Sequence, residues 1–356
     1  MIMRLLGIVA ASALVVAGVG AGVIVTHSGR AVATTTTSTS STTTTVPYER
    51  PQAGWAVASA SPRGVMVDYK MIDLAGVNFR VIRLHARTTL LRWHIGTQDP
   101  PVRYGQIPAD AGPSINWSNE GLAGVVAVFN GAFKVGARAG GSMVDGVTLS
   151  PLSPGRMTLA IDAAGHWKMG VWASGFPGVH FHAIAFRQNL MPMIADGKLT
   201  SAALSSNELI WGDPLKPGPH EPRSALGIDV HGNLIYVATM TNVSPTAIAQ
   251  ALLAAGAFEG MELDINPYWP IEGAPFAPLH APGNYPVQIP YAEHNPNIYN
   301  TGWERDFFVG LAEPGSWNCS WVSAGLGKLT GIAQPQALHE VCNVKGSPLT
   351  TTTAAG

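Results

Sequence analysis

Apolar and polar positions alternate in the segment Val77–His85, whose sequence is VNFRVIRLH. This period of two residues predicts a β-strand. A second segment, Gly124–Phe129 (GVVAVF), is apolar throughout, which is typical of a strand buried on both faces. It ends at Asn130-Gly131, a dipeptide that favours a turn.

Two later segments repeat one pattern of residues. Arg156–Gly165 (RMTLAIDAAG) and Arg223–Gly232 (RSALGIDVHG) share Arg, Leu, Ile, Asp and Gly at the same spacing, and an apolar stretch follows each. We expect two β-hairpins whose turns use the Asp and the Gly. Common turn chemistry accounts for these two residues, but it does not account for the Arg that precedes each strand.

The segment Ser244–Gly256 (SPTAIAQALLAAG) predicts an α-helix. Its first two residues suit the N-cap and the first helical position, and its last residue suits the C-terminal cap. Apolar residues recur at helical spacing, which indicates one buried stripe: Ile248, Ala251, Leu252 and Ala255.

This helix leads into the apolar segment Met261–Ile265, so strand, helix and strand are expected to form a crossover between parallel strands. We therefore predict an α+β fold, a mixed β-sheet with packed helices in a single catalytic-type domain. In such sheets ligands gather at the carboxyl ends of strands, where Asp264 is expected. Glu262 and Asp264 share a strand face, and burying both carboxylates unpaired is costly.

The two ends of the chain differ in composition from its middle. Residues 1–33 contain the apolar run Leu5–Thr26, about as long as the ~20 residues that cross a bilayer. The run is either a transmembrane anchor or a signal peptide cleaved after Ala31-Val32-Ala33. Both interpretations place the rest of the chain outside the cytoplasm, as a membrane-anchored or secreted protein. The remaining chain is expected to comprise a disordered Thr/Ser-rich linker at 34–49, a folded domain at 50–346 and a disordered tail at 347–356.

The composition of the chain limits the classes of function that it can have. Only 12% of the 356 residues are charged and the net charge is −1, so no basic field favours nucleic acid. Cys319 and Cys342 form either one disulfide, as expected in an exported chain, or two free buried thiols. Two cysteines are too few for a structural zinc site. The motifs of Ser hydrolases, phosphate loops and zinc proteases do not occur.

Four motifs occur in an order that resembles the phosphodiester glycosidase family, which includes the enzyme domain that uncovers mannose 6-phosphate by removing N-acetylglucosamine. Together they cover about residues 75–312. They are Asn130-Gly131-Ala132-Phe133, the strand start Arg223–Gly227, the Gly256-Ala257-Phe258 step with Leu263-Asp264, and Glu304–Gly310 (ERDFFVG). The chain departs from the family pattern where Ala132 replaces a Gly and where Ile265-Asn266-Pro267 replaces the glycines after the Asp.

The resemblance implies a hydrolase that cleaves a glycosyl phosphodiester, with Asp264, Arg223 and Asn130 as its catalytic residues. A buried Arg223 would bind the phosphate through a bidentate fork. Asp264 would stabilise the oxocarbenium-like charge at the anomeric carbon, and the amide of Asn130 would orient a substrate oxygen. The expected substrate-binding residues are Gly131, Ser224, Glu262 and Asn266, and no metal or cofactor is required.

Alternative interpretations of these residues remain open. Arg223 and Asp264 would otherwise form an internal ion pair, Asn130 would be a simple turn residue, and Glu262 an edge residue. Asp264 and Asn266 would instead offer oxygen ligands to Ca²⁺. At the level of function, the alternative to a hydrolase is a non-catalytic module that binds an envelope glycan in the same cleft. The altered residues after Asp264 favour that module.

Overall fold

A computed structural model describes most of the central part of the chain. The described residues are 52–61, 63–102, 111–116, 120, 124–137, 139–212, 220–265, 273–279, 298–313, 319–320 and 341–342. The predicted membrane segment, linker and tail lie outside them, as does Asn266. Within the described ranges, no helix has both the length and the apolar character needed to cross a membrane.

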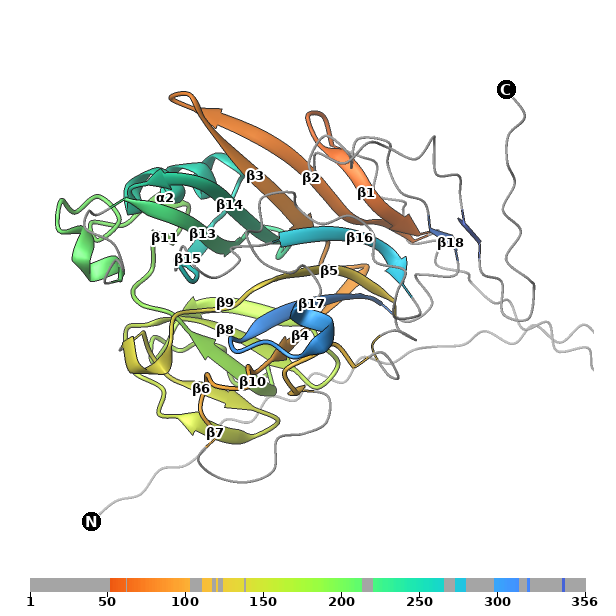
Figure 1. The fold of residues 1–356 in the computed structure, drawn as a ribbon, viewed down its shortest axis with the longest axis horizontal. Helices are drawn as coiled ribbons and strands as arrows, with labels where there is room; N and C mark the ends of the chain where they lie inside the picture. The colour runs from red at the N-terminus through yellow and green to blue at the C-terminus, as the bar shows by residue number, and fades with distance from the viewer. Residues whose placement is uncertain are drawn as a thin grey trace, which may run out of the picture. The chain divides into compact units, whose positions relative to one another are not determined.

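The largest sheet has eight strands, and every neighbouring pair in it is antiparallel. Its strands, in spatial order, are β1 (Ala56–Ser61), β2 (Gly64–Leu74), β3 (Val77–Leu84), β14 (Leu234–Val243), β13 (Glu221–Ile228), β15 (Glu259–Glu262), β11 (Ile194–Ala195) and β12 (Lys198–Leu199). Figure 1 shows this sheet in the upper part of the view.

Two smaller antiparallel sheets accompany it (Figure 1). The four-stranded sheet has the order β16 (Gly273–Leu279), β5 (Val125–Asn130), β17 (Phe307–Ala312) and β4 (Thr89–His94). The five-stranded sheet has the order β7 (Val147–Ser150), β6 (Ser142–Val144), β10 (Ala183–Gln188), β8 (Met157–Asp162) and β9 (Trp167–Val171).

The remaining elements are short, apart from one helix. They are α2 (Pro245–Ala254), α3 (Ile298–Thr301), the 3₁₀ turns η2 (Val135–Ala137) and η3 (Glu208–Trp211), and the paired strands β18 (Cys319–Ser320) and β19 (Val341–Cys342). In that pair Cys319 lies opposite Cys342. The disulfide between them stays a prediction.

The prediction of an α+β fold with a mixed sheet and packed helices is wrong, because the described chain is built mainly from antiparallel sheets. The error lies in how the elements join. The strand Val77–Leu84, the two hairpins β8–β9 and β13–β14, and the helix α2 all form where the sequence places them. The helix does connect strands that run in the same direction, β14 and β15, but β13 lies between them and pairs antiparallel with both.

The helix α2 lies on one face of the eight-stranded sheet. The side chain of Ser244 caps its first turn by accepting a hydrogen bond from the Ala247 N–H. Ile248 and Leu252 are fully buried. Leu252 lies so close to the sheet that a Cβ on Gly260 would come within 2.7 Å of it, so a glycine in β15 permits this close packing.

The opposite face of the eight-stranded sheet packs against the four-stranded sheet. The ring of Phe129 in β5 lies 5.2 Å from that of Tyr236 in β14 and 5.3 Å from that of Phe308 in β17. Register places Asn130, the last residue of β5, opposite Phe307, the first residue of β17. The end of one strand therefore meets the start of the other, at the edge of the core where the candidate site lies.

Candidate functional site

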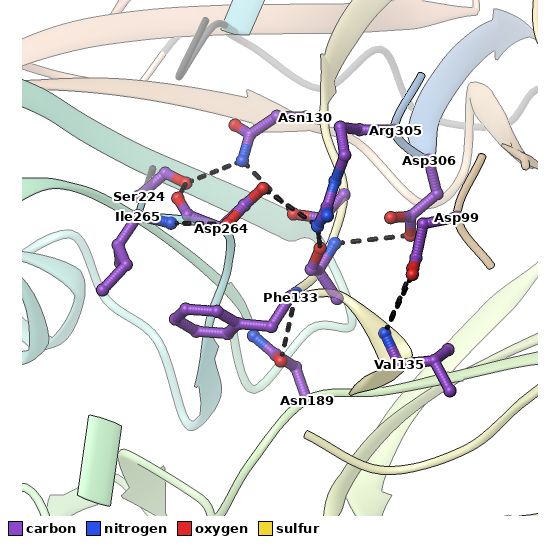
Figure 2. A network of polar contacts seen from close by, with 12 residues as sticks. Asp99, Asn130, Phe133, Val135, Asn189, Ser224, Asp264, Ile265, Arg305 and Asp306 are labelled. Carbon is purple, nitrogen blue, oxygen red and sulfur yellow. Dashed lines mark hydrogen bonds and ion pairs between the residues drawn. The ribbon is translucent and has the colours of Figure 1, made fainter. Parts of the chain in front are cut away.

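Four distant segments meet at one end of the two packed sheets, as Figure 2 shows. The N–H of Asp264, just after β15, donates to the carbonyl oxygen of Gly131 at 3.0 Å. The Ser224 hydroxyl in β13 donates to the carbonyl oxygen of Asp264 at 3.3 Å. The fourth segment, Arg305-Asp306 before β17, reaches this network through Arg305. Residues from each of the four motifs of the family resemblance therefore lie in one network.

Asn130 is held by protein partners on both ends of its amide. Its nitrogen donates to Ser224 Oγ at 3.0 Å and to the Gly131 carbonyl oxygen at 3.2 Å. Its oxygen accepts the Tyr236 hydroxyl at 2.7 Å. The side chain is buried, so its orientation is fixed by the strands around it.

Gly131 is required by close packing. A Cβ at this position would lie 2.4 Å from the Asp306 carboxyl carbon and 2.6 Å from the Asp306 carbonyl oxygen. The Gly131 N–H donates to that same carbonyl oxygen at 2.9 Å. The Asn-Gly dipeptide, interpreted from sequence as a turn signal, therefore also allows β5 to approach the segment before β17.

Asp264 presents its carboxylate at the centre of the network. One oxygen accepts the N–H of Ile265 at 3.0 Å, and the other lies 3.0 Å from Nη2 of Arg305. The Asp264 side chain is 12% exposed and that of Arg305 is 5% exposed. Solvent therefore reaches this ion pair mainly at the carboxylate.

Arg305 lies within one of the four sequence motifs, but the sequence alone gives this residue no role. Nη2 also donates to the carbonyl oxygen of Ala132 at 2.9 Å. The other two nitrogens, Nε and Nη1, are buried and have no hydrogen-bond partner among the described residues. Figure 2 shows the guanidinium between Asp264 and Asp306.

Asp306 forms its ion pair with a different arginine. Arg187, at the end of β10, donates from Nε to one carboxylate oxygen at 2.7 Å and from Nη2 to the other at 3.2 Å. The indole N–H of Trp93 and the main-chain N–H of Ala132 also donate to Asp306, at 3.0 and 3.3 Å. These donors fully compensate the negative charge of Asp306, so the role of this side chain is to hold the segment before β17 in place.

Arg223 and Glu262 form a separate pair that is sealed from solvent. Arg223 is 1% exposed and Glu262 is 0% exposed. Arg223 donates from Nη1 to a carboxylate oxygen of Glu262 and from Nε to the carbonyl oxygen of Val243 at 2.9 Å. The structure therefore places the expected phosphate-binding arginine against the expected second carboxylate. The internal ion pair considered from sequence joined Arg223 to Asp264, and the structure shows Arg223 paired with Glu262.

Burial dominates the electrostatics of Glu262. It raises the pKa of the carboxyl group from 4.5 to about 7, against the lowering effect of the Arg223 charge and hydrogen bond, while the charge of Asp264 raises it further. The second carboxylate oxygen of Glu262 has no partner among the described residues. Because the carboxyl group of Glu262 is enclosed, this group influences the site through its charge and by holding its neighbours in position.

Two further residues near the site carried no sequence signal. Asn189, after β10, donates to the carbonyl oxygen of Glu262 and accepts the N–H of Phe133 at 3.3 Å. Asp99 accepts the N–H of Val135 at 3.1 and 3.2 Å. Burial raises the pKa of the Asp99 carboxyl group, opposed by the charges of Arg187 and Arg305. Both lie outside the four motifs, so only the fold brings them here.

The described residues show no group of three or more His, Cys, Asp or Glu side chains arranged to hold a metal ion. The Ca²⁺ alternative involves Asn266, outside the described ranges, and is not tested. Two described cavities lie elsewhere. One of about 160 Å³ is bordered by Arg92, Trp93 and Asp145, and one of about 430 Å³ by Phe176, Asp196 and Glu259.

No protein-family model and no curated protein matches the sequence. Among solved structures, the zebrafish N-acetylglucosamine-1-phosphodiester alpha-N-acetylglucosaminidase catalytic domain, auto-inhibited by its pro-peptide, is similar with a TM-score of 0.44 and 12% identity, over 72% of this chain and 87% of that one. A hypothetical protein from Synechocystis has a TM-score of 0.41 and 11% identity, over 70% and 63% of the two chains. These values describe a partial likeness of the backbone and do not bear on activity.

Proposed function

We propose that the protein is an exported hydrolase that cleaves a glycosyl phosphodiester in cell-envelope or extracellular glycans. The observation that carries the proposal is the convergence of Asn130, Ser224, Asp264 and Arg305, one from each of the four family-like segments, in a single polar network. A buried carboxylate beside a guanidinium suits an anionic carbohydrate.

In the proposed reaction the bond between the anomeric carbon and the phosphate oxygen breaks. The electron pair leaves with the phosphate monoester, and positive charge develops on the sugar ring. Asp264 stabilises that charge through its carboxylate, which Arg305 and the Ile265 N–H hold in a fixed orientation. Water adds to the anomeric carbon, and its proton passes to the solvent or to the released phosphate. Since a phosphate monoester is a good leaving group, a strong general acid is not needed.

The proposed role of Arg223 changes with its surroundings. Its guanidinium is enclosed with Glu262 and bonded to the end of β14. We therefore assign it to positioning the end of β15, from which Asp264 follows, and not to direct phosphate binding.

Turnover of a sugar phosphodiester by the purified full chain tests the proposal. UDP-linked sugars and chromogenic sugar phosphodiesters form the substrate panel. Asp264→Asn is expected to lower kcat/KM by at least ~10²-fold, because it removes the charge that stabilises the transition state. The matched control is Asp73→Asn, which changes an exposed carboxylate near the end of β2 that accepts the N–H of Gly76; this variant should behave like wild type.

A non-catalytic glycan-binding module is the second candidate. The sequence Ile265-Asn266-Pro267 after Asp264 favours it, because a proline fixes φ and removes an N–H where the family carries glycines. This candidate prevails if wild type turns over none of the panel while both wild type and Asp264→Asn bind envelope glycans equally.

A further inference from the structure

Among the residues that the structure describes, Arg305 is the buried arginine whose hydrogen bonding is least complete. It is 4% exposed, and two of its three side-chain nitrogens lack a partner among the described residues. Arg83 and Arg187 are buried to a similar degree, at 7% and 1% exposed. Each of their three nitrogens donates a hydrogen bond. The fold therefore provides acceptors for every side-chain nitrogen of these two buried arginines, but the described residues provide none for Nε and Nη1 of Arg305.

Unsatisfied charged donors in a protein interior are costly and call for a specific explanation. A guanidinium has five N–H groups. Nη2 is used by Asp264 and by the Ala132 carbonyl oxygen, so the remaining three N–H groups are on Nε and Nη1. An anionic oxygen is the acceptor that a buried guanidinium bonds most strongly.

We propose that Arg305 is the phosphate-binding residue of this site, and that its Nε and Nη1 donate to the non-bridging oxygens of a glycosyl phosphate. The identity of the sugar part rests on the proposed function, while binding of the phosphate does not. Nη2 remains on Asp264. One guanidinium thus places the phosphate beside the carboxylate that acts on the anomeric carbon.

The charges around Arg305 are compatible with an added anion. Asp306 is paired with Arg187, and Asp264 is paired with Arg305. The charge of Arg305 also lowers the pKa of a third carboxyl group, that of Asp99, which accepts a main-chain N–H. Burial raises the pKa of the Asp99 carboxyl group, which weakens the opposition of this group to an added anion.

Binding measurements separate this inference from the proposed function. The probes are inorganic phosphate, glucose 1-phosphate and glucose, titrated into the full chain by calorimetry and by ³¹P NMR. We expect wild type to bind both phosphates in competition and not to bind glucose alone. Arg305→Lys keeps the positive charge but loses the planar donor set, and should weaken phosphate binding by at least ~10-fold. The surface control Arg63→Lys, in the exposed pair with Glu313, should bind as wild type does.

Asp264→Asn completes the design, because it removes a negative charge next to the anion. It should bind glucose 1-phosphate at least as tightly as wild type. Phosphate binding that needs Arg305, in a protein without turnover, would support the inference and remove the proposed function. Arg305→Lys with unchanged phosphate binding, or wild type that binds neither phosphate, would overturn the inference even if phosphodiesters are hydrolysed. A thermal unfolding curve confirms that each variant is folded.

Discussion

Glu262 lies fully buried beside Arg223, and its burial has a consequence for stability that can be measured. The pKa of its carboxyl group is about 7 in the folded protein, against an ordinary value of 4.5. The folded protein therefore binds this proton more tightly than the unfolded chain does. The stability that the proton contributes is fully present below pH 4.5 and is lost as the pH rises through about 7.

Glu262→Gln is expected to remove this pH dependence. Between pH 4.5 and pH 8 the free energy of unfolding of wild type should fall by about 3 kcal/mol relative to that of the variant. Urea unfolding at several pH values measures the difference. Parallel pH profiles for the two proteins would contradict the assignment, and Glu313→Gln, near the surface, provides the control.

Single residues also show what a sequence can reveal of chemistry. The sequence places Asp264 after an apolar strand and Asn130 at the end of another, while the catalytic roles expected for them come from the family resemblance. The role given to Arg223 depended on its exposure, which no sequence pattern reports. Arg305 lies within one of the four motifs, but only the two nitrogens that lack a partner in the described part of the chain distinguish it from a structural arginine.

Between elements, the contact of β5 with the segment before β17 sets the geometry of the site. It depends on Gly131, since a Cβ there would overlap the side chain and the main chain of Asp306. Elements of this protein were largely predictable: alternation gave β3, turn chemistry gave two hairpins, and capping gave α2. The order of the strands in the sheet was not predictable, because β13 lies between β14 and β15 through pairing that the local sequence pattern does not encode.

Gly131→Ala should destabilise the fold by about 1–3 kcal/mol, the usual cost of overpacking, and should lower activity through displacement of Asn130 and Arg305. Gly136→Ala is the matched control, because a Cβ at Gly136 meets no atom within 4 Å and its φ is not positive. Denaturant unfolding and turnover of both variants measure these effects. Equal stability of the two variants would show that the segments can separate without cost.

At the scale of the whole molecule, three antiparallel sheets bring together residues more than 170 positions apart, such as Ala132 and Arg305. This long-range convergence explains why Asp99 and Asn189 could not be found from sequence. The fold places Arg305 between the carboxylates of Asp264 and Asp306 (Figure 2). In the proposed reaction, a phosphodiester bound at this place reacts at the anomeric carbon and not at phosphorus.

Hydrolysis in ¹⁸O-labelled water tests that central claim most directly. If Asp264 stabilises charge on the sugar, the anomeric carbon–oxygen bond breaks and the water oxygen adds to carbon. The released phosphate monoester should then show no ¹⁸O shift by ³¹P NMR, and the label should appear in the freshly released sugar. Label in the phosphate would mean attack at phosphorus and would contradict the proposed reaction.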